Sequence, residues 1–154
     1  MKEIKNYTSF ELEIRDKKID KIFNLNSNEL QETFTKPLTE KRYKLYVIKK
    51  SKKFLYIGIT RQSLSSRFRL GLNASGKNGY HGYKWKDMEK IKLFVWVFDN
   101  YDEKQLESIE AELVLLVRNT TKRWPLFQNE IHFNNNFTNG KKVASQIFEL
   151  INEV

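Results

Sequence analysis

The stretch from Tyr43 to Thr60 constrains the fold of this chain more than any other. Two segments rich in β-branched and aromatic residues, 43–48 and 54–60, flank a lysine-rich stretch. This pattern predicts a β-hairpin, because such residues pack well on a pleated surface and the polar residues between them suit a turn. If the turn leaves an odd number of residues unpaired, Tyr46 and Tyr56 lie opposite each other on one face. An even number would place them on opposite faces.

A helix is predicted to follow the hairpin. Its buried stripe repeats every four residues and consists of Leu64, Phe68 and Leu72. Ser63 is a plausible N-cap, Arg67 borders the stripe, and Arg69 points away from it. Residues 73–86 combine glycine with aromatic and basic side chains, which predicts a loop.

The second half of the chain predicts one strand and two helices. Residues 93–98 form a continuous apolar run, as expected for a strand covered on both faces. Residues 103–118 and 141–154 have the apolar periodicity of helices. Glu110 falls inside the buried arc of the first helix, whereas Glu107 lies at its edge. A carboxylate in that position is costly unless it is paired or bound to a cation.

The first 42 residues are predicted to form an accessory element. Phe10, Leu12 and Ile14 alternate with polar residues, as in a half-buried strand. Residues 19–25 have mixed spacing, so a strand and a helix both remain open there. Ser27 followed by NELQETF has the form of an N-cap before a short helix that ends at Pro37.

The predicted order of elements gives an α/β (α+β) fold with a small, mainly antiparallel three-stranded sheet flanked by helices. The expected divisions are an accessory element at 1–42, a core at 43–135 and a C-terminal helix at 136–154, all in one compact domain. With 154 residues, the chain is long enough for one core of ordinary size.

The composition limits which metal ions the chain could bind and in which compartment it is expected. The chain has no cysteine and only two histidines, so any metal must be held mainly by oxygen, which favours Mg²⁺ or Mn²⁺ over zinc. No apolar run is long enough to span a bilayer, and the N-terminus does not read as a signal peptide. The expected location is therefore cytoplasmic, without membrane attachment.

The net charge of +9 is concentrated in the middle of the chain. Residues 51–92 carry 10 Lys and Arg against 2 acids, whereas residues 93–154 carry 6 against 9. Phosphate contacts supply most non-specific affinity for nucleic acid. The segment that holds Tyr56 and Arg67 is therefore a candidate surface for a polyanion.

Five motif positions together resemble the GIY-YIG nuclease superfamily. They are Leu45-Tyr46, Tyr56-Ile57-Gly58, Arg67, Glu110 and Asn129. The resemblance covers about residues 43–135 and includes an intact second motif. Lys44 departs from the first motif, and Ile59 stands where members often carry a polar residue. Gly71 stands where many members place a histidine or tyrosine, and His81 could serve in its stead.

The resemblance implies a metal-dependent DNA endonuclease. Glu110 would anchor Mg²⁺ or Mn²⁺, and Arg67 would bind phosphate oxygens. Tyr46 or Tyr56 would orient or deprotonate the attacking water, which for a tyrosine requires nearby positive charge. Asn129 would support the phosphate or the geometry of the site.

Further cations and two aromatic residues are expected to contact nucleic acid: Arg61, Arg69, Lys77, Tyr83, Lys84 and Trp85. DNA is the expected partner, with RNA as the alternative, for a monomer or a homodimer.

Taken singly, a strand tyrosine is commonly a packing residue and Arg67 a solvated one. A salt bridge would also explain Glu110. The alternative functions are a nucleic-acid-binding protein that keeps the fold without the chemistry, and a protein that binds another protein through its aromatic loop.

Overall fold

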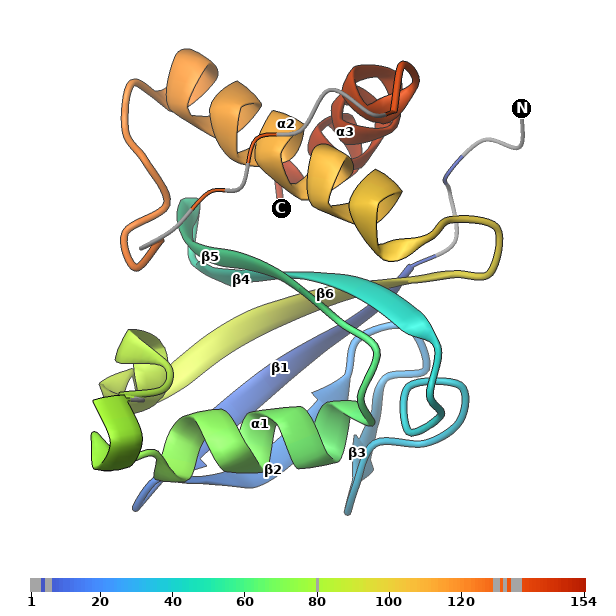
Figure 1. Ribbon diagram of the computed structural model, residues 1–154. Coiled ribbons are helices and arrows are strands. Elements are labelled where there is room, and N and C mark those ends of the chain that lie inside the picture. Colours follow the sequence, from blue (N-terminus) through green and yellow to red (C-terminus); the bar gives the residue numbers. More distant parts are fainter. Residues whose placement is uncertain (1–3, 5–6, 80, 129–130, 132, 134–136) are drawn as a thin grey trace.

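A single six-stranded antiparallel sheet organises the computed structural model, with helices on both of its faces (Figure 1). The structure describes residues 4, 7–79, 81–128, 131, 133 and 137–154. The strands are β1 (Thr8–Arg15), β2 (Lys18–Asn24), β3 (Glu29–Gln31), β4 (Tyr43–Lys50), β5 (Lys53–Thr60) and β6 (Lys90–Phe98). The helices are α1 (Leu64–Asn73), α2 (Glu103–Thr121) and α3 (Gly140–Ile151), with short 3₁₀ turns η1 (Lys77–Gly79) and η2 (Lys84–Asp87).

The prediction of a three-stranded sheet is wrong. The strand order is β3-β2-β1-β6-β4-β5, so the N-terminal residues extend the sheet beyond β6. The sequence pattern did not reveal these additional strands for two reasons. β2 is largely exposed and pairs with β1 through an irregular register, and β3, which lies beyond it, has only three residues. Strands with one exposed face and an edge position depend on their neighbours more than on their own sequence.

The short helix predicted after Ser27 is also wrong. Residues 29–31 form β3, which pairs with β2 from Ile22 to Asn24. The positive φ of 60° at Asn28 makes a tight turn between these strands. Strand pairing therefore overrides the capping signal at this place.

The other helices and the apolar strand agree with the sequence pattern. α2 begins with a capping box, in which the backbone N–H of Gln105 donates to the Asp102 carboxylate at 2.8 Å and the Gln105 side chain accepts from the Asp102 N–H at 2.9 Å. β6 is almost entirely buried, as its apolar run predicts. No helix in the described part of the chain is long and apolar enough to cross a bilayer.

The hairpin of β4 and β5 contains a β-bulge that decides where its tyrosines point. Lys50 pairs with Lys53 across a two-residue turn, an even number that would separate the tyrosines. Ile48 then pairs with Tyr56 and Lys49 with Phe54, so Leu55 is the extra residue of a bulge. The bulge restores the parity, and Tyr46 and Tyr56 face the same side of the sheet.

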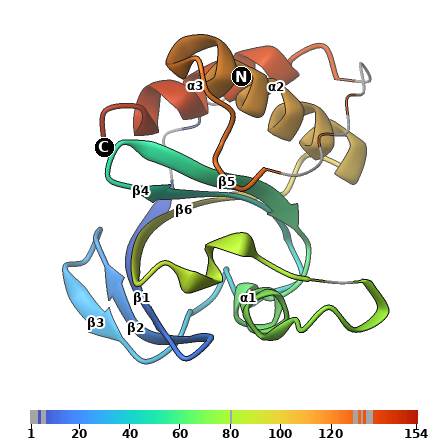
Figure 2. The ribbon, with the colours of Figure 1, turned by 90° about the vertical axis from the view of Figure 1, so that its left-hand side faces the viewer.

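The sheet separates two apolar cores. α1 covers the face that carries Tyr46, and its buried residues join a core with those of β1, β4 and β6. α2 and α3 cover the opposite face, with Leu45, Val47 and Ile57 (Figures 1 and 2). Side chains of successive strand residues thus enter different cores, as the alternation of a strand requires.

Lys44 closes the open end of the hairpin. Its side chain is fully buried and its Nζ donates to the carbonyls of Glu40 at 2.7 Å, Arg42 at 2.7 Å and Gln62 at 3.0 Å. Burial is the main cause that lowers the pKa of Lys44 to about 8. Lys44, the residue that departs from the first motif, therefore connects the backbone just before β4 with the backbone just after β5.

Candidate functional site

Tyr46 and Tyr56 lie side by side beneath α1. Their ring centroids are 6.0 Å apart, and Tyr46 is fully buried. Gly58 pairs with Tyr46 across the hairpin. A Cβ at Gly58 would come within 2.7 Å of both tyrosine rings, so the motif glycine is what allows the two rings to occupy this face.

Tyr83 is a third tyrosine in this cluster. Its hydroxyl oxygen lies 2.8 Å from that of Tyr46, and its ring centroid lies 5.6 Å from that of Tyr56. The ring also rests on Gly71, where a Cβ would come within 2.1 Å of it. Tyr83 therefore fills, from the loop after α1, the space that a side chain at position 71 would take.

The sequence carried one signal for Tyr83. A glycine inside a helix costs stability and marks a place where another group approaches the backbone closely. Gly71 is that glycine, and the Tyr83 N–H donates to its carbonyl at 3.0 Å. The partner itself could not be chosen from the aromatic residues of the loop without the fold.

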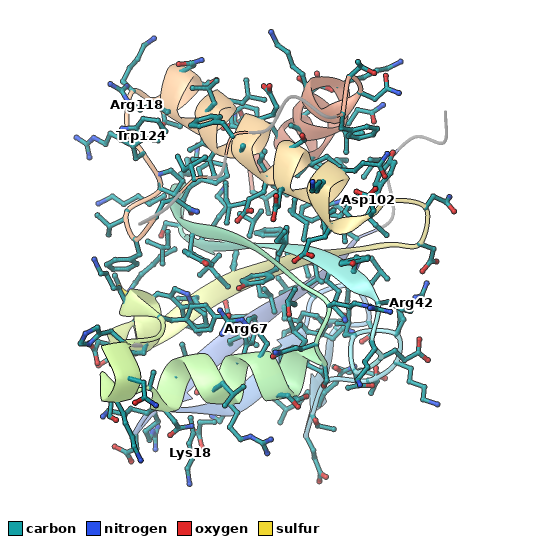
Figure 3. All side chains as sticks on the ribbon, viewed as in Figure 1. Lys18, Arg42, Arg67, Asp102, Arg118 and Trp124 are labelled. Carbon is teal, nitrogen blue, oxygen red and sulfur yellow. The ribbon has the colours of Figure 1, made fainter. Side chains whose placement is uncertain are left out.

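Arg67 brings positive charge to the tyrosines. It extends from α1 toward the sheet, and its guanidinium carbon lies 4.9 Å from the centroid of the Tyr83 ring (Figure 3). Burial, followed by Tyr83 and Tyr56, raises the pKa of Tyr46 well above its ordinary value, although the charge of Arg67 opposes the rise. Tyr46 is therefore a protonated hydrogen-bonding group at neutral pH.

Glu110 belongs to a different layer from these tyrosines. It projects from α2, whose buried residues pack on the opposite face of the sheet, whereas the resemblance implies one site that Glu110 shares with the tyrosines. Burial and then the neighbouring Glu107 raise the pKa of Glu110 to about 8. Among the residues that the structure describes, no three His, Asp or Glu side chains gather to hold a metal ion.

We expect Glu110→Gln to remove a pH-dependent loss of stability. The pKa of Glu110 is about 8 in the folded chain and 4.5 in its ordinary range. The folded state therefore binds more protons between these values, and wild-type stability falls as the pH rises through them. Without added metal, the melting temperature of the variant should exceed that of the wild type by a margin that grows between about pH 5 and pH 9. A margin that is constant over this range would contradict the raised pKa.

β5 is an edge strand, and residues 126–128 run along it. The N–H groups of Leu126 and Phe127 donate to the carbonyls of Phe54 at 3.0 Å and Leu55 at 2.8 Å. The Gln128 side chain accepts from the Ile57 N–H at 3.0 Å and donates to its carbonyl at 3.1 Å. Asn129, the next predicted site residue, lies outside the described residues.

His81 and Trp85 take different places from those expected. The His81 ring lies against Gly76 and is exposed, while Tyr83 takes the position at Gly71. Trp85 is fully buried and its ring stacks on Tyr83 at a centroid distance of 4.5 Å. The indole therefore packs against Tyr83 within the core and presents no surface to nucleic acid in this structure.

The predicted cations are exposed, and they do not share one side of the sheet, because Arg61 contacts Tyr43, which packs against the core beneath α2 and α3. Arg69 and Lys77 line one shallow depression at the end of α1. Arg61, at the other end, holds its guanidinium carbon 5.5 Å from the centroid of the Tyr43 ring. Lys84 is exposed on η2.

The structure thus brings Tyr46, Tyr56 and Arg67 together, adds Tyr83, and keeps Glu110 in the layer beyond the sheet. Comparison of the chain with protein-family models, with curated proteins and with solved structures gave no match. The resemblance to the GIY-YIG superfamily therefore stays an expectation that rests on the motif residues of the sequence alone.

Proposed function

We propose that this protein is a metal-dependent endonuclease that hydrolyses phosphodiester bonds of DNA. The observation that carries the proposal is the cluster of Tyr46, Tyr56 and Arg67 on one face of the hairpin. Phosphodiester hydrolysis needs a cation against the phosphate and a group that orients water. An arginine held among tyrosines supplies both kinds of group in one place.

The burial of the tyrosines divides their roles. Tyr46 is fully buried and hydrogen-bonded to Tyr83, so its role would be to position the other tyrosines of the cluster. Tyr56 is only partly buried, so its hydroxyl is the candidate for contact with the attacking water or the phosphate. Arg67 would bind phosphate oxygens through its planar fork of donors, and its stack on Tyr83 fixes the direction of that fork.

Glu110 fits the requirements of a magnesium ligand. Mg²⁺ commonly uses one or two protein carboxylates and keeps several waters, and Glu110 is a half-buried carboxylate beside Glu107. A cation there would relieve the repulsion and burial that raise the pKa of Glu110. When bound, the ion would polarise a phosphate oxygen. One substrate would have to reach both groups past the end of β5, because residues 126–128 are hydrogen-bonded along that strand at Phe54, Leu55 and Ile57.

A plasmid-nicking assay tests the proposal. Supercoiled DNA incubated with the wild type and Mg²⁺ or Mn²⁺ should become nicked, and EDTA should stop the reaction. Glu110→Ala should lose at least about 100-fold in rate, on the scale of a lost electrostatic contact to the transition state. Glu112→Ala, two residues further along α2, is the matched control and should nick at the wild-type rate. Failure of the wild type to nick, or equal nicking by Glu110→Ala, would refute the proposal.

The second candidate is a nucleic-acid-binding protein without catalysis. The placement of Glu110 in the layer opposite the tyrosines favours it, as does the complete burial of Tyr46. In that case binding would persist without metal, weaken steeply with salt and be indifferent to Glu110→Ala.

For both candidate functions, the proposed partner is DNA, with RNA as the alternative, and the proposed location is the cytoplasm.

A further inference from the structure

Trp124 is an exposed indole in a chain whose other tryptophans are buried. The residue is 49% exposed, whereas Trp85 and Trp96 are 0% and 1% exposed. It lies at the outside of the molecule, beyond the end of α2 (Figure 3). Leu126, two residues further on, is 60% exposed. An aromatic ring that folding leaves in water is a candidate contact surface.

The backbone that carries Trp124 is fixed to the sheet. Leu126 and Phe127 donate backbone hydrogen bonds to the edge of β5, and the Phe127 side chain packs into the core beneath α1. The exposed indole therefore stands on a rigid support beside the strand that carries Tyr56. A rigid ring loses little conformational entropy when it makes a contact.

The surroundings of Trp124 are cationic. Residues 118–124 include Arg118, Lys122 and Arg123 and no acid. The guanidinium carbon of Arg118 lies 5.8 Å from the centroid of the Trp124 ring, and Arg123 is exposed beside it. An aromatic ring flanked by cations suits a base whose phosphates lie on either side of it.

We propose that Trp124, Arg118 and Arg123 form a stacking platform for an unpaired base of a single-stranded nucleic acid. The platform would hold the strand beside the edge of β5, and it rests on the proposed function as the means by which a frayed or single-stranded substrate is held. Base stacking on an aromatic side chain is tolerant of sequence, because every base presents a π-face. The cations select a polyanion over an uncharged apolar partner.

The burial of two tryptophans makes the third a specific probe. Acrylamide should quench chiefly the fluorescence of Trp124, and saturating oligo(dT) or oligo(U) should protect it. Fluorescence anisotropy of a labelled oligo(dT) should show that Trp124→Ala weakens binding about 10-fold, within the range of one lost stacking contact. Trp124→Phe should retain most of the affinity. Leu30→Ala is the control, because Leu30 is 66% exposed and lies on β3, at the other edge of the sheet.

The outcomes separate the platform from the nuclease. Protection of Trp124 by oligonucleotide in a protein that does not nick plasmid would support the platform and refute the nuclease. Nicking by a protein whose Trp124→Ala variant binds oligo(dT) as tightly as the wild type would overturn the platform alone. Loss of self-association in Trp124→Ala, with oligonucleotide affinity unchanged, would also overturn it and assign the indole to a protein interface.

Discussion

Replacing Arg67 with alanine is expected to lower the rate of plasmid nicking by about 100-fold or more, comparable to the loss of a key electrostatic contact in other enzymes. The physical reason is that Arg67 would place its charge beside the phosphate, and the same charge opposes the rise in the pKa of Tyr46. The measurement is the initial rate of nicking at saturating Mg²⁺, together with duplex affinity by anisotropy. Affinity should fall much less than the rate.

Two controls distinguish a positioned arginine from a loss of general charge. Arg67→Lys keeps the charge but loses the planar fork, so its rate should lie between those of the wild type and the alanine variant. Arg69→Ala removes an exposed cation from the same helix and should weaken binding at low salt with little change in the saturated rate. Wild-type nicking by Arg67→Ala would place the phosphate elsewhere and refute this role.

Gly71→Ala is expected to destabilise the protein, although alanine is the better helix former. In an open helix position the change would stabilise by about 1 kcal/mol. Here the new Cβ would lie 2.1 Å and 2.2 Å from the Cε2 and Cδ2 atoms of the Tyr83 ring, which cannot yield easily because it stacks on Trp85. Overpacking of this kind costs about 1–3 kcal/mol. Urea unfolding at neutral pH measures the effect.

A double variant isolates the clash that we infer. If Tyr83 is the obstacle, Tyr83→Ala combined with Gly71→Ala should be more stable than the sum of the single changes, by about 1 kcal/mol or more. Ser66→Ala on the same helix is a control that should change stability by less than about 0.5 kcal/mol. Stabilisation by Gly71→Ala alone would show that Tyr83 does not occupy this space.

The hairpin, α1, β6, α2 and α3 were predictable because each carries a local apolar pattern of its own, which is periodic in the helices and continuous in β6. The N-terminal strands were only partly predictable. β1 alternates cleanly, but β2 and β3 hold their conformation through hydrogen bonds to neighbours rather than through local preference. A sheet of six strands could therefore not be counted from its sequence segments.

The site was predictable as separate residues and not as an arrangement. Whether Tyr46 and Tyr56 share a face depends on the bulge at Leu55, and no residue type in this segment indicates a bulge. The layer in which Glu110 lies depends on which face of the sheet α2 covers, a question of topology rather than of helical periodicity. Tyr83 was expected to contact nucleic acid from the loop, and its place in the tyrosine cluster could not be predicted because its partners Tyr46 and Gly71 are distant in sequence.

The bulge in the hairpin also allows the length of this segment to vary by one residue. Without Leu55, Lys49 would still pair with Phe54 and Ile48 with Tyr56 in a regular ladder, so Tyr46 and Tyr56 would stay on one face. The cost would be the loss of a buried side chain from the core beneath α1. Chains that keep the tyrosine pair can therefore differ by one residue at this place, and the spacing of the two tyrosines along the chain is not itself required.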